Sequence, residues 1–321
     1  MGKISDALKK VMNERQEQKK IQMLKLKEEA VKIREKEKAA SYKTKSETAA
    51  FKPTLKDKLD SLKYEEFYVA RAKDTSGIDP RIVTYFDHSS PVVEQYKILR
   101  TNLKSYLLKA AKSKSTANLK SVNSPKIVAV TSSLHSEGKT VTCVNLAVSL
   151  AKNPDTKVLL IDCDLRNGMI HGLLGIDSVP GLTEVLTADY DYSVALHPTK
   201  MRNLFVIPRG KPPANPAELL DSKKMQLILE QLKVEPLTYV IIDTPPVITF
   251  TDASVICSKA DAVALVVQAH RTQEQVVRRA KDLIQQAHGK FLGFILTQTD
   301  YYIPDLYSYY YYYRYKKHNQ S

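Results

Sequence analysis

Residues 126–151 read KIVAVTSSLHSEGKTVTCVNLAVSLA, and this stretch decides the fold class. Its first six residues are mostly apolar, as in a strand that is buried on both faces. From Lys139 onward the apolar residues recur at helical spacing, and Glu137, Gly138, Lys139 and Thr140 join the two patterns. A strand, a polar loop ending in Lys-Thr and a helix together predict a site for phosphate groups at the start of the helix.

Each residue type in this loop has a chemical reason. Backbone N–H groups and the helix N-terminus meet phosphate oxygens, Lys139 supplies a positive charge, and the Thr140 hydroxyl can ligate Mg²⁺. The standard spacing of a Walker A loop requires Gly at position 133, where this chain has Ser133. The sequence therefore predicts a variant phosphate-binding loop, and the alternative is an ordinary loop with a surface lysine.

Strand and helix patterns alternate along the rest of this region. Such alternation predicts a mostly parallel α/β sheet with helices on both faces, which binds ligands at the carboxyl ends of its strands. The predicted strands after 126–131 are 157–162, 203–208, 239–243, 262–269 and 291–297, and the predicted helices are 139–152, 216–232, 252–259 and 272–288.

Carboxylates follow two of these strands. Asp162 and Asp164 stand two residues apart in IDCDLR, so both point to one side if the strand geometry continues. Asp243 ends the strand YVIID, a position from which a carboxylate reaches Mg²⁺ directly or through water. An Asp at a strand end is also a common helix cap or turn former. Three carboxylates on the same rim as Lys139 nevertheless favour a nucleotide and metal site.

The rest of the chain differs in composition. Residues 1–80 are rich in Lys, Glu, Gln and Ala, which predicts a basic, mostly helical or disordered extension, whereas 91–110 has the pattern of an amphipathic helix. The net charge of +14 indicates an anionic partner such as ATP, an acidic protein or an anionic membrane surface. No nucleic-acid partner is expected. Cys143, Cys163 and Cys257 are expected to be reduced and buried.

Neither a membrane span nor a signal peptide is recognisable. No run of about 18 apolar residues occurs, and the first residues lack the apolar centre of a signal peptide. We therefore expect a cytoplasmic protein. Residues 1–60 contain 17 Lys and Arg against 10 Asp and Glu, a net charge of 17 − 10 = +7 that is suited to a peripheral contact with an anionic membrane. Glu and Lys at i, i+4 spacing also fit a solvated helix.

The motifs resemble those of the bacterial tyrosine kinases, which regulate capsular and extracellular polysaccharide export. The resemblance covers about residues 78–315. It rests on SSLHSEGKT as Walker A, VLLIDCDLRNGMIH as Walker A′, VIIDTPP as Walker B, GLTEVLT, IPRGKPPANPAELLDSKKM and a C-terminal tyrosine cluster. It implies a P-loop kinase domain over 81–300 that uses ATP and Mg²⁺. The Walker motifs alone are also similar to those of partitioning and septum-positioning ATPases.

The resemblance also implies roles for individual residues. Lys139 and Thr140 hold the nucleotide and the metal, Asp243 binds Mg²⁺ through water, and one of Asp162 and Asp164 orients or deprotonates the tyrosine while the other orders the metal shell. A carboxylate base is needed because a phenol with a pKa near 10 is a poor nucleophile at pH 7. The implied metal-binding residues are Thr140, Asp162 and Asp243, and the implied nucleotide-binding segment is Ser136, Glu137, Gly138, Lys139, Thr140 and Val141.

The tail at 301–321 is the implied substrate. Tyrosines this dense must place hydroxyls on every face of an extended chain. In the family one subunit's tail enters a neighbour's site within a ring, and a membrane protein of the polysaccharide co-polymerase type recruits and activates the kinase at the inner face of the cell membrane. A disordered end that packs by stacking is the alternative. The implied phosphoacceptors are Tyr301, Tyr302, Tyr307, Tyr309, Tyr310, Tyr311, Tyr312, Tyr313 and Tyr315.

Three departures from the family pattern affect these expectations. His135-Ser136 replaces the usual Pro-Gly, and Ser at position 136 costs about 1 kcal/mol more than Gly if φ there is positive. The ring-contact pattern reads Glu94, Lys97, Arg100, with a lysine where the family has arginine. Thr297-Gln298 stands where the family has Asn near the nucleotide base.

Two other functions remain open on the sequence alone. The chain would be an ATPase switch, positioning envelope or partitioning machinery without tyrosine phosphorylation, if the tail took no part in the chemistry. It would be a nucleotide-binding scaffold with little catalysis if the His135-Ser136 loop closed poorly.

Overall fold

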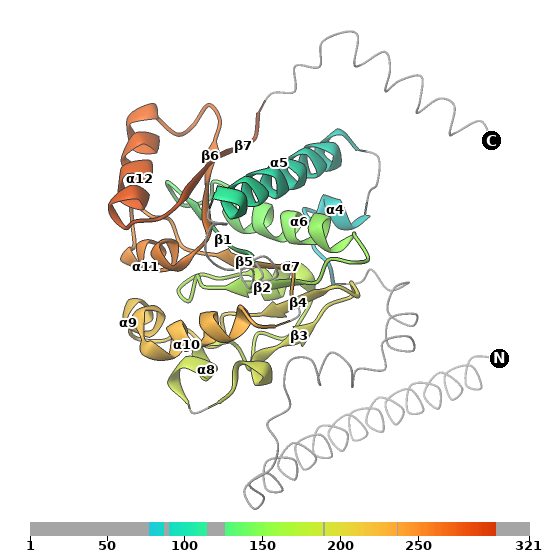
Figure 1. The fold of residues 1–321 in the computed structure, drawn as a ribbon, viewed down its shortest axis with the longest axis vertical. Coiled ribbons are helices and arrows are strands. Elements are labelled where there is room, and N and C mark those ends of the chain that lie inside the picture. The colour runs from blue at the N-terminus through green and yellow to red at the C-terminus, as the bar shows by residue number, and fades with distance from the viewer. Residues whose placement is uncertain (1–76, 87–89, 114–125, 189, 236, 300–321) are drawn as a thin grey trace, which may run out of the picture. The chain divides into compact units, whose positions relative to one another are not determined.

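A seven-stranded sheet forms the centre of the computed structural model, which describes residues 77–86, 90–113, 126–188, 190–235 and 237–299. The strand order is β3-β4-β2-β5-β1-β6-β7 (Figure 1). All neighbouring strands pair in parallel except β3 and β4, which are antiparallel. The parallel α/β sheet predicted from the alternation is therefore confirmed.

The strands agree closely with the predicted ones. Both boundaries of all six predicted strands lie within one residue of the prediction, and β5 and β7 match it at both ends, because continuous apolar runs mark strands that are covered on both faces. The strands are β1 Lys126–Ser132, β2 Val158–Asp162, β3 His197–Pro198, β4 Leu204–Ile207, β5 Tyr239–Asp243, β6 Ala262–Gln268 and β7 Phe291–Thr297.

The helices agree less closely. The single helix predicted over 216–232 is wrong: Ser222 has extended backbone angles and its hydroxyl caps a second helix by accepting the N–H of Met225, so two helices form. The short elements β3, α7, α8 and η2 had no predicted counterpart. The helices are α4 Val83–Phe86, α5 Pro91–Ser113, α6 Lys139–Ala151, α7 Ile170–Leu174, α8 Leu182–Thr187, η2 Tyr192–Ala195, α9 Pro216–Asp221, α10 Lys223–Leu232, α11 Thr251–Lys259 and α12 Glu274–Gln286.

Helices cover both faces of the sheet and bury two apolar clusters. On one face α5 and α6 pack together, and on the other lie α8 to α12 (Figure 1). Alternate residues of each strand belong to opposite clusters; Ile127 and Ala129 contact one, and Val128 and Val130 the other. The three cysteines are free and buried in these clusters, as predicted.

The strand order brings the predicted polar residues to one rim. β5 lies between β1 and β2, and its last residue Asp243 is in register with Asp162 of β2 and with Val130 of β1. The loop after β1, which carries Lys139 and Thr140, therefore lies beside both aspartates. Residues 1–76 of the extension predicted over 1–80, and the tyrosine tail, lie outside the described residues.

Candidate active site

The phosphate loop between β1 and α6 turns through two residues with left-handed backbone angles. Gly138, which precedes the first residue of α6, has φ 88°, and Ser136 has φ 63°. Glycine adopts such angles freely, whereas serine pays a steric cost because it carries a Cβ. The positive φ considered for position 136 is thus confirmed, and the loop closes despite the serine.

Lys139 lies at the centre of the site. Its Nζ is 2.8 Å from Asp164 Oδ2 and 3.7 Å from Asp243 Oδ2, and its side chain is only 12% exposed. Burial by itself lowers the pKa of Lys139, but the carboxylates of Asp243 and Asp164 reverse the effect and raise it above its ordinary value. The lysine is therefore a permanent positive charge at the N-terminus of α6.

Thr140 and Asp243 face each other across the loop. The Thr140 hydroxyl donates to Asp243 Oδ2 at 2.7 Å. The other oxygen of this carboxylate, Oδ1, is buried and has no hydrogen-bond partner among the described residues. Burial raises the pKa of Asp243 to about 6, although Lys139 and the Thr140 hydroxyl oppose the shift.

This pair fits a hard divalent cation. Mg²⁺ prefers oxygen ligands and is usually held by one or two protein groups together with water and substrate phosphates. A hydroxyl and a carboxylate with an unused oxygen, beside a phosphate loop, match that donor set. Thr140 and Asp243 are the residues that would hold the ion.

Asp162 is buried beneath the rim. Its Oδ1 accepts the backbone N–H of Asp164 and its Oδ2 that of Ile170, both at 3.2 Å. The strand β2 ends at Asp162, so the condition that strand geometry continues through this pair is not met. Asp164 lies at the start of the turn that follows and reaches Lys139 from there. Burial and the neighbouring Asp243 raise the pKa of Asp162. A Cβ on Gly168 would lie 2.2 Å from Asp162 Oδ1, so only glycine fits against this carboxylate.

A charge pair holds the loop that follows β2. The Arg166 guanidinium donates from Nε and Nη2 to the two oxygens of Asp252 at 2.9 and 3.2 Å, and Asp252 is fully buried. Arg166 also stacks over the Phe250 ring at 4.6 Å, and His135 of the phosphate loop meets the same ring edge-on at 5.7 Å. Phe250 thus contacts both loops of the rim.

A cavity of about 530 Å³ opens above these residues, a size that suits a nucleotide. Ser136 to Val141 and Asp164 line it, in agreement with the predicted segment. Arg81, which pairs with Asp79 at 2.8 Å, and Tyr96 of α5 also line it. The sequence analysis missed both residues, because they precede β1 in the chain and no local motif links them to the phosphate loop. Thr297 and Gln298, at the end of β7, complete the wall.

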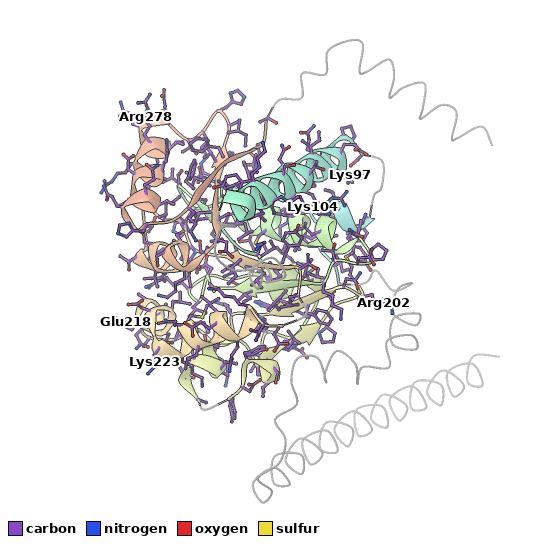
Figure 2. The ribbon with its side chains drawn as sticks, viewed as in Figure 1. Lys97, Lys104, Arg202, Glu218, Lys223 and Arg278 are labelled. Atoms are coloured by element: carbon purple, nitrogen blue, oxygen red, sulfur yellow. The ribbon has the colours of Figure 1, made fainter. Side chains whose placement is uncertain are left out.

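The predicted ring-contact residues lie on α5. Lys97 Nζ is 2.6 Å from Glu94 Oε1, and Arg100 donates to the Ser149 carbonyl of α6 at 2.8 Å. Figure 2 shows Lys97 and Lys104 along this helix. Glu94 and Lys97 therefore form an ion pair within one subunit. The role of the three residues as ring contacts stays a prediction.

Two other predictions concern the tyrosine tail and the membrane. The tyrosines at 301–315 lie outside the described residues, so their role as phosphoacceptors stays a prediction. Within the described ranges, no helix combines the length and the apolar character needed to span a bilayer.

Comparisons with known proteins show which family the chain resembles. A family model described as an AAA domain matches residues 125–291, just over half of the chain. The tyrosine-protein kinase CpsD of Streptococcus agalactiae is 39% identical over 176 residues, which are 54% of this chain and 76% of that protein. The crystal structure of the chimerical protein CapA2B2 aligns with a TM-score of 0.60 and 26% identity, over 70% of this chain and 92% of that chain.

The kinase domain of the Escherichia coli tyrosine kinase ETK has the same fold. It aligns with a TM-score of 0.55 and 29% identity, over 66% of this chain and 79% of that chain. P-loop kinases bind ATP at the loop described above. Because its sequence is 39% identical to a tyrosine kinase over three quarters of that protein's length, and its fold aligns with that of another, the chain belongs to the family of bacterial tyrosine kinases.

Proposed function

We propose that this kinase transfers the γ-phosphoryl group of ATP, with Mg²⁺, to the tyrosine cluster at the C-terminus of a neighbouring subunit, and thereby regulates synthesis and export of a capsular or extracellular polysaccharide. The observation that carries the proposal is the contact of Lys139 and Thr140 with Asp164 and Asp243 on one rim. It assembles a phosphate site, a metal site and carboxylates in one cavity.

The binding roles follow from the geometry. The N–H groups at the start of α6 and the Lys139 ammonium bind the phosphates, because both are positive and point into the cavity from the same loop. Thr140 and Asp243 hold Mg²⁺, which when bound neutralises charge on the β- and γ-phosphates. Arg81 and Gln298 also line the cavity, and they would contact the nucleoside.

The transfer itself needs a base. The tyrosine oxygen forms a bond to the γ-phosphorus while the bond to the bridging β–γ oxygen breaks, ADP leaves, and the phenol proton passes to a carboxylate. Asp162 and Asp164 are the two candidate bases, and one of them accepts this proton. Asp164 lines the cavity and pairs with Lys139, whereas Asp162 lies below it with its oxygens bonded to backbone amides.

Separate Asp162→Asn and Asp164→Asn variants distinguish the two. We expect the variant that lacks the base to bind ATP and to lose transfer, and the other to lose metal-dependent ATP affinity as well. Equal loss of ATP binding in both variants would mean that neither acts only as the base.

The partner and the location follow from the family. We propose that the chain forms a ring of subunits and is recruited to the inner face of the cell membrane by a membrane activator of the CapA type. The likeness to the chimerical protein CapA2B2 supports the association with such a partner. Glu94, Lys97 and Arg100 are the proposed ring contacts.

The test uses the full chain with Mg²⁺ and labelled ATP, with and without the cytoplasmic segment of the membrane partner. We expect alkali-stable label on the tail tyrosines. The label should be absent from Lys139→Met and from a variant with all tail tyrosines changed to Phe. It should be retained in the control Lys233→Met, which removes an exposed lysine that does not line the cavity. Equal ATP hydrolysis by wild type and the Phe variant, with no tyrosine label even with the partner, would instead support the ATPase switch.

A further inference from the structure

Glu137 is a buried acid inside the phosphate loop, and only 1% of it is exposed. Burying a charged carboxylate is costly unless protein groups satisfy its oxygens. Here Oε2 accepts the N–H of Leu134 at 2.6 Å, and Oε1 accepts the Thr272 hydroxyl and, at 3.4 Å, the N–H of Gln268. The side chain is thus satisfied by protein donors and not by a ligand.

Two of the three donors to this carboxylate come from a distant part of the chain. Gln268 ends β6, and Thr272 lies in the segment between β6 and α12. The same segment makes a second contact, because Arg271 donates to the Ser136 carbonyl at 3.3 Å. Thr297 at the end of β7 donates to the Glu137 carbonyl at 2.7 Å. We call the four donors Gln268, Arg271, Thr272 and Thr297 the loop clamp.

The clamp fixes the direction of the phosphate-binding amides. In a trans peptide the carbonyl and the N–H of the next residue point in opposite directions. Holding the carbonyls of Ser136 and Glu137 outward therefore directs the N–H groups of Glu137 and Gly138 the other way. These are amides of the loop that lines the nucleotide cavity.

The clamp also acts where the backbone is strained. Ser136 has φ 63°, an angle that persists only when the surrounding structure over-determines it. The contacts on Ser136 and Glu137 supply that constraint at the strained residue and at the residue that follows it. Without them, a serine at this position would relax toward negative φ and turn the amides away.

We infer that Glu137 is a positioning residue for ATP, and that the clamp sets nucleotide affinity by holding the phosphate loop against the ends of β6 and β7. The inference rests on ATP binding at this loop. The Glu137 side chain thus does not contact the nucleotide. It connects the phosphate loop to Gln268 and Thr272 by hydrogen bonds. Thr272 is the residue that tests it most directly, because its hydroxyl bonds the buried carboxylate and does not line the cavity.

The experiment compares Thr272→Val, Thr272→Ser and the control Thr187→Val, in the full chain. Thr187 also donates its hydroxyl to a protein oxygen, the Thr183 carbonyl, but lies in α8. Calorimetric titration with ATP and Mg²⁺ should show binding weakened about tenfold in Thr272→Val, since a hydrogen bond to a charged group is worth about that factor. Thr272→Ser should restore it and the control should not change it.

Kinetics separate positioning from a loss of folded protein. We expect the KM for ATP of Thr272→Val to rise about tenfold with kcat within about twofold, because the phosphates are held alike in the ground and transition states. A smaller amount of folded protein would lower the apparent kcat and leave KM unchanged. Arg271→Met, at an exposed residue, provides a second variant if Thr272→Val does not fold.

A Ser136→Gly background tests the link to strain. Glycine needs no clamp to keep positive φ, so Thr272→Val should weaken ATP binding less in this background than in the wild type. An equal penalty in both backgrounds would contradict the proposed link. Wild-type binding of ATP with no change in Thr272→Val would overturn the clamp alone, whereas a wild type that does not bind ATP would overturn the proposed function with it.

Discussion

The two loops of the active-site rim are held in different ways. The loop after β1 contains a serine at positive φ and depends on hydrogen bonds from the segment after β6 and from β7. The loop after β2 has no left-handed residue over 163–169. It depends instead on a buried charge pair, Arg166 with Asp252, and on the close contact of Gly168 with Asp162.

The difference follows from what each loop must present. The first presents backbone N–H groups, whose direction is set by φ and ψ, so the chain there accepts backbone strain. The second presents carboxylates, whose position is set by side-chain packing and countercharge. Phe250 touches His135 of the first loop and Arg166 of the second. Removing the support of the first loop should therefore affect mainly nucleotide binding, and removing that of the second should affect mainly catalysis and stability.

Gly168→Ala should have the largest effect. The new Cβ would overlap the Asp162 carboxylate, and a displacement of about 1 Å in an active site costs about 100-fold in rate. We expect kcat for tail phosphorylation to fall by about that factor, measured with labelled ATP. Gly172→Ala is the matched control, because a Cβ there meets no atom within 4 Å. Equal activity of both variants would show that the Asp162 position is not critical.

Arg166→Met should destabilise the second loop most. It leaves Asp252 buried without its countercharge, and breaking a buried pair lowers the free energy of unfolding by about 3 kcal/mol. Denaturant unfolding measures the change. Arg278→Met is the control, since its pair with Glu274 is exposed and should contribute less than about 1 kcal/mol. An equal decrease in the free energy of unfolding in both variants would contradict the larger contribution expected from the Arg166–Asp252 pair.

Phe250→Leu removes the ring that contacts both loops. We expect the free energy of unfolding to fall by about 1 to 2 kcal/mol, the sum of an edge-on ring contact and a cation–π contact. ATP affinity should also weaken, as titration would show. Phe291→Leu removes the same two kinds of contact, with Phe294 and Lys281, at the start of β7. It should cost stability without changing ATP affinity, and a fall in affinity there would contradict the comparison.

Ser136→Gly should have the smallest effect, and the opposite sign. Glycine at φ 63° relieves a strain of about 1 kcal/mol, so the melting temperature should rise. Ser258→Gly, in the helix α11, should instead lower stability by up to about 1 kcal/mol, because glycine is unfavourable in helices. A decrease in both variants would mean that the phosphate loop is not strained at Ser136.

Most of the sheet and part of the site were predictable from the sequence. The strands were recognised because continuous apolar runs report burial on both faces. Asp162 and Asp243 were recognised because they stand at strand ends, and Lys139 because a Gly-Lys-Thr loop opens the helix after the first strand. The division of residues 216–232 into two helices was missed, since a single serine that caps a new helix does not interrupt the apolar pattern. Arg81 and Tyr96 were missed because no local pattern links them to a phosphate loop far along the chain.

The sequence by itself determined which residues are apolar, where the strands end and which charged groups follow them, because these properties depend on neighbours a few residues away. Only the tertiary structure decided that β5 lies between β1 and β2, which sets Asp243 beside Asp162 and within reach of Thr140. It also decided that the Glu137 carboxylate accepts a hydrogen bond from the Thr272 hydroxyl. Such contacts join residues that are more than 80 positions apart, and they form only when the chain has packed around one sheet.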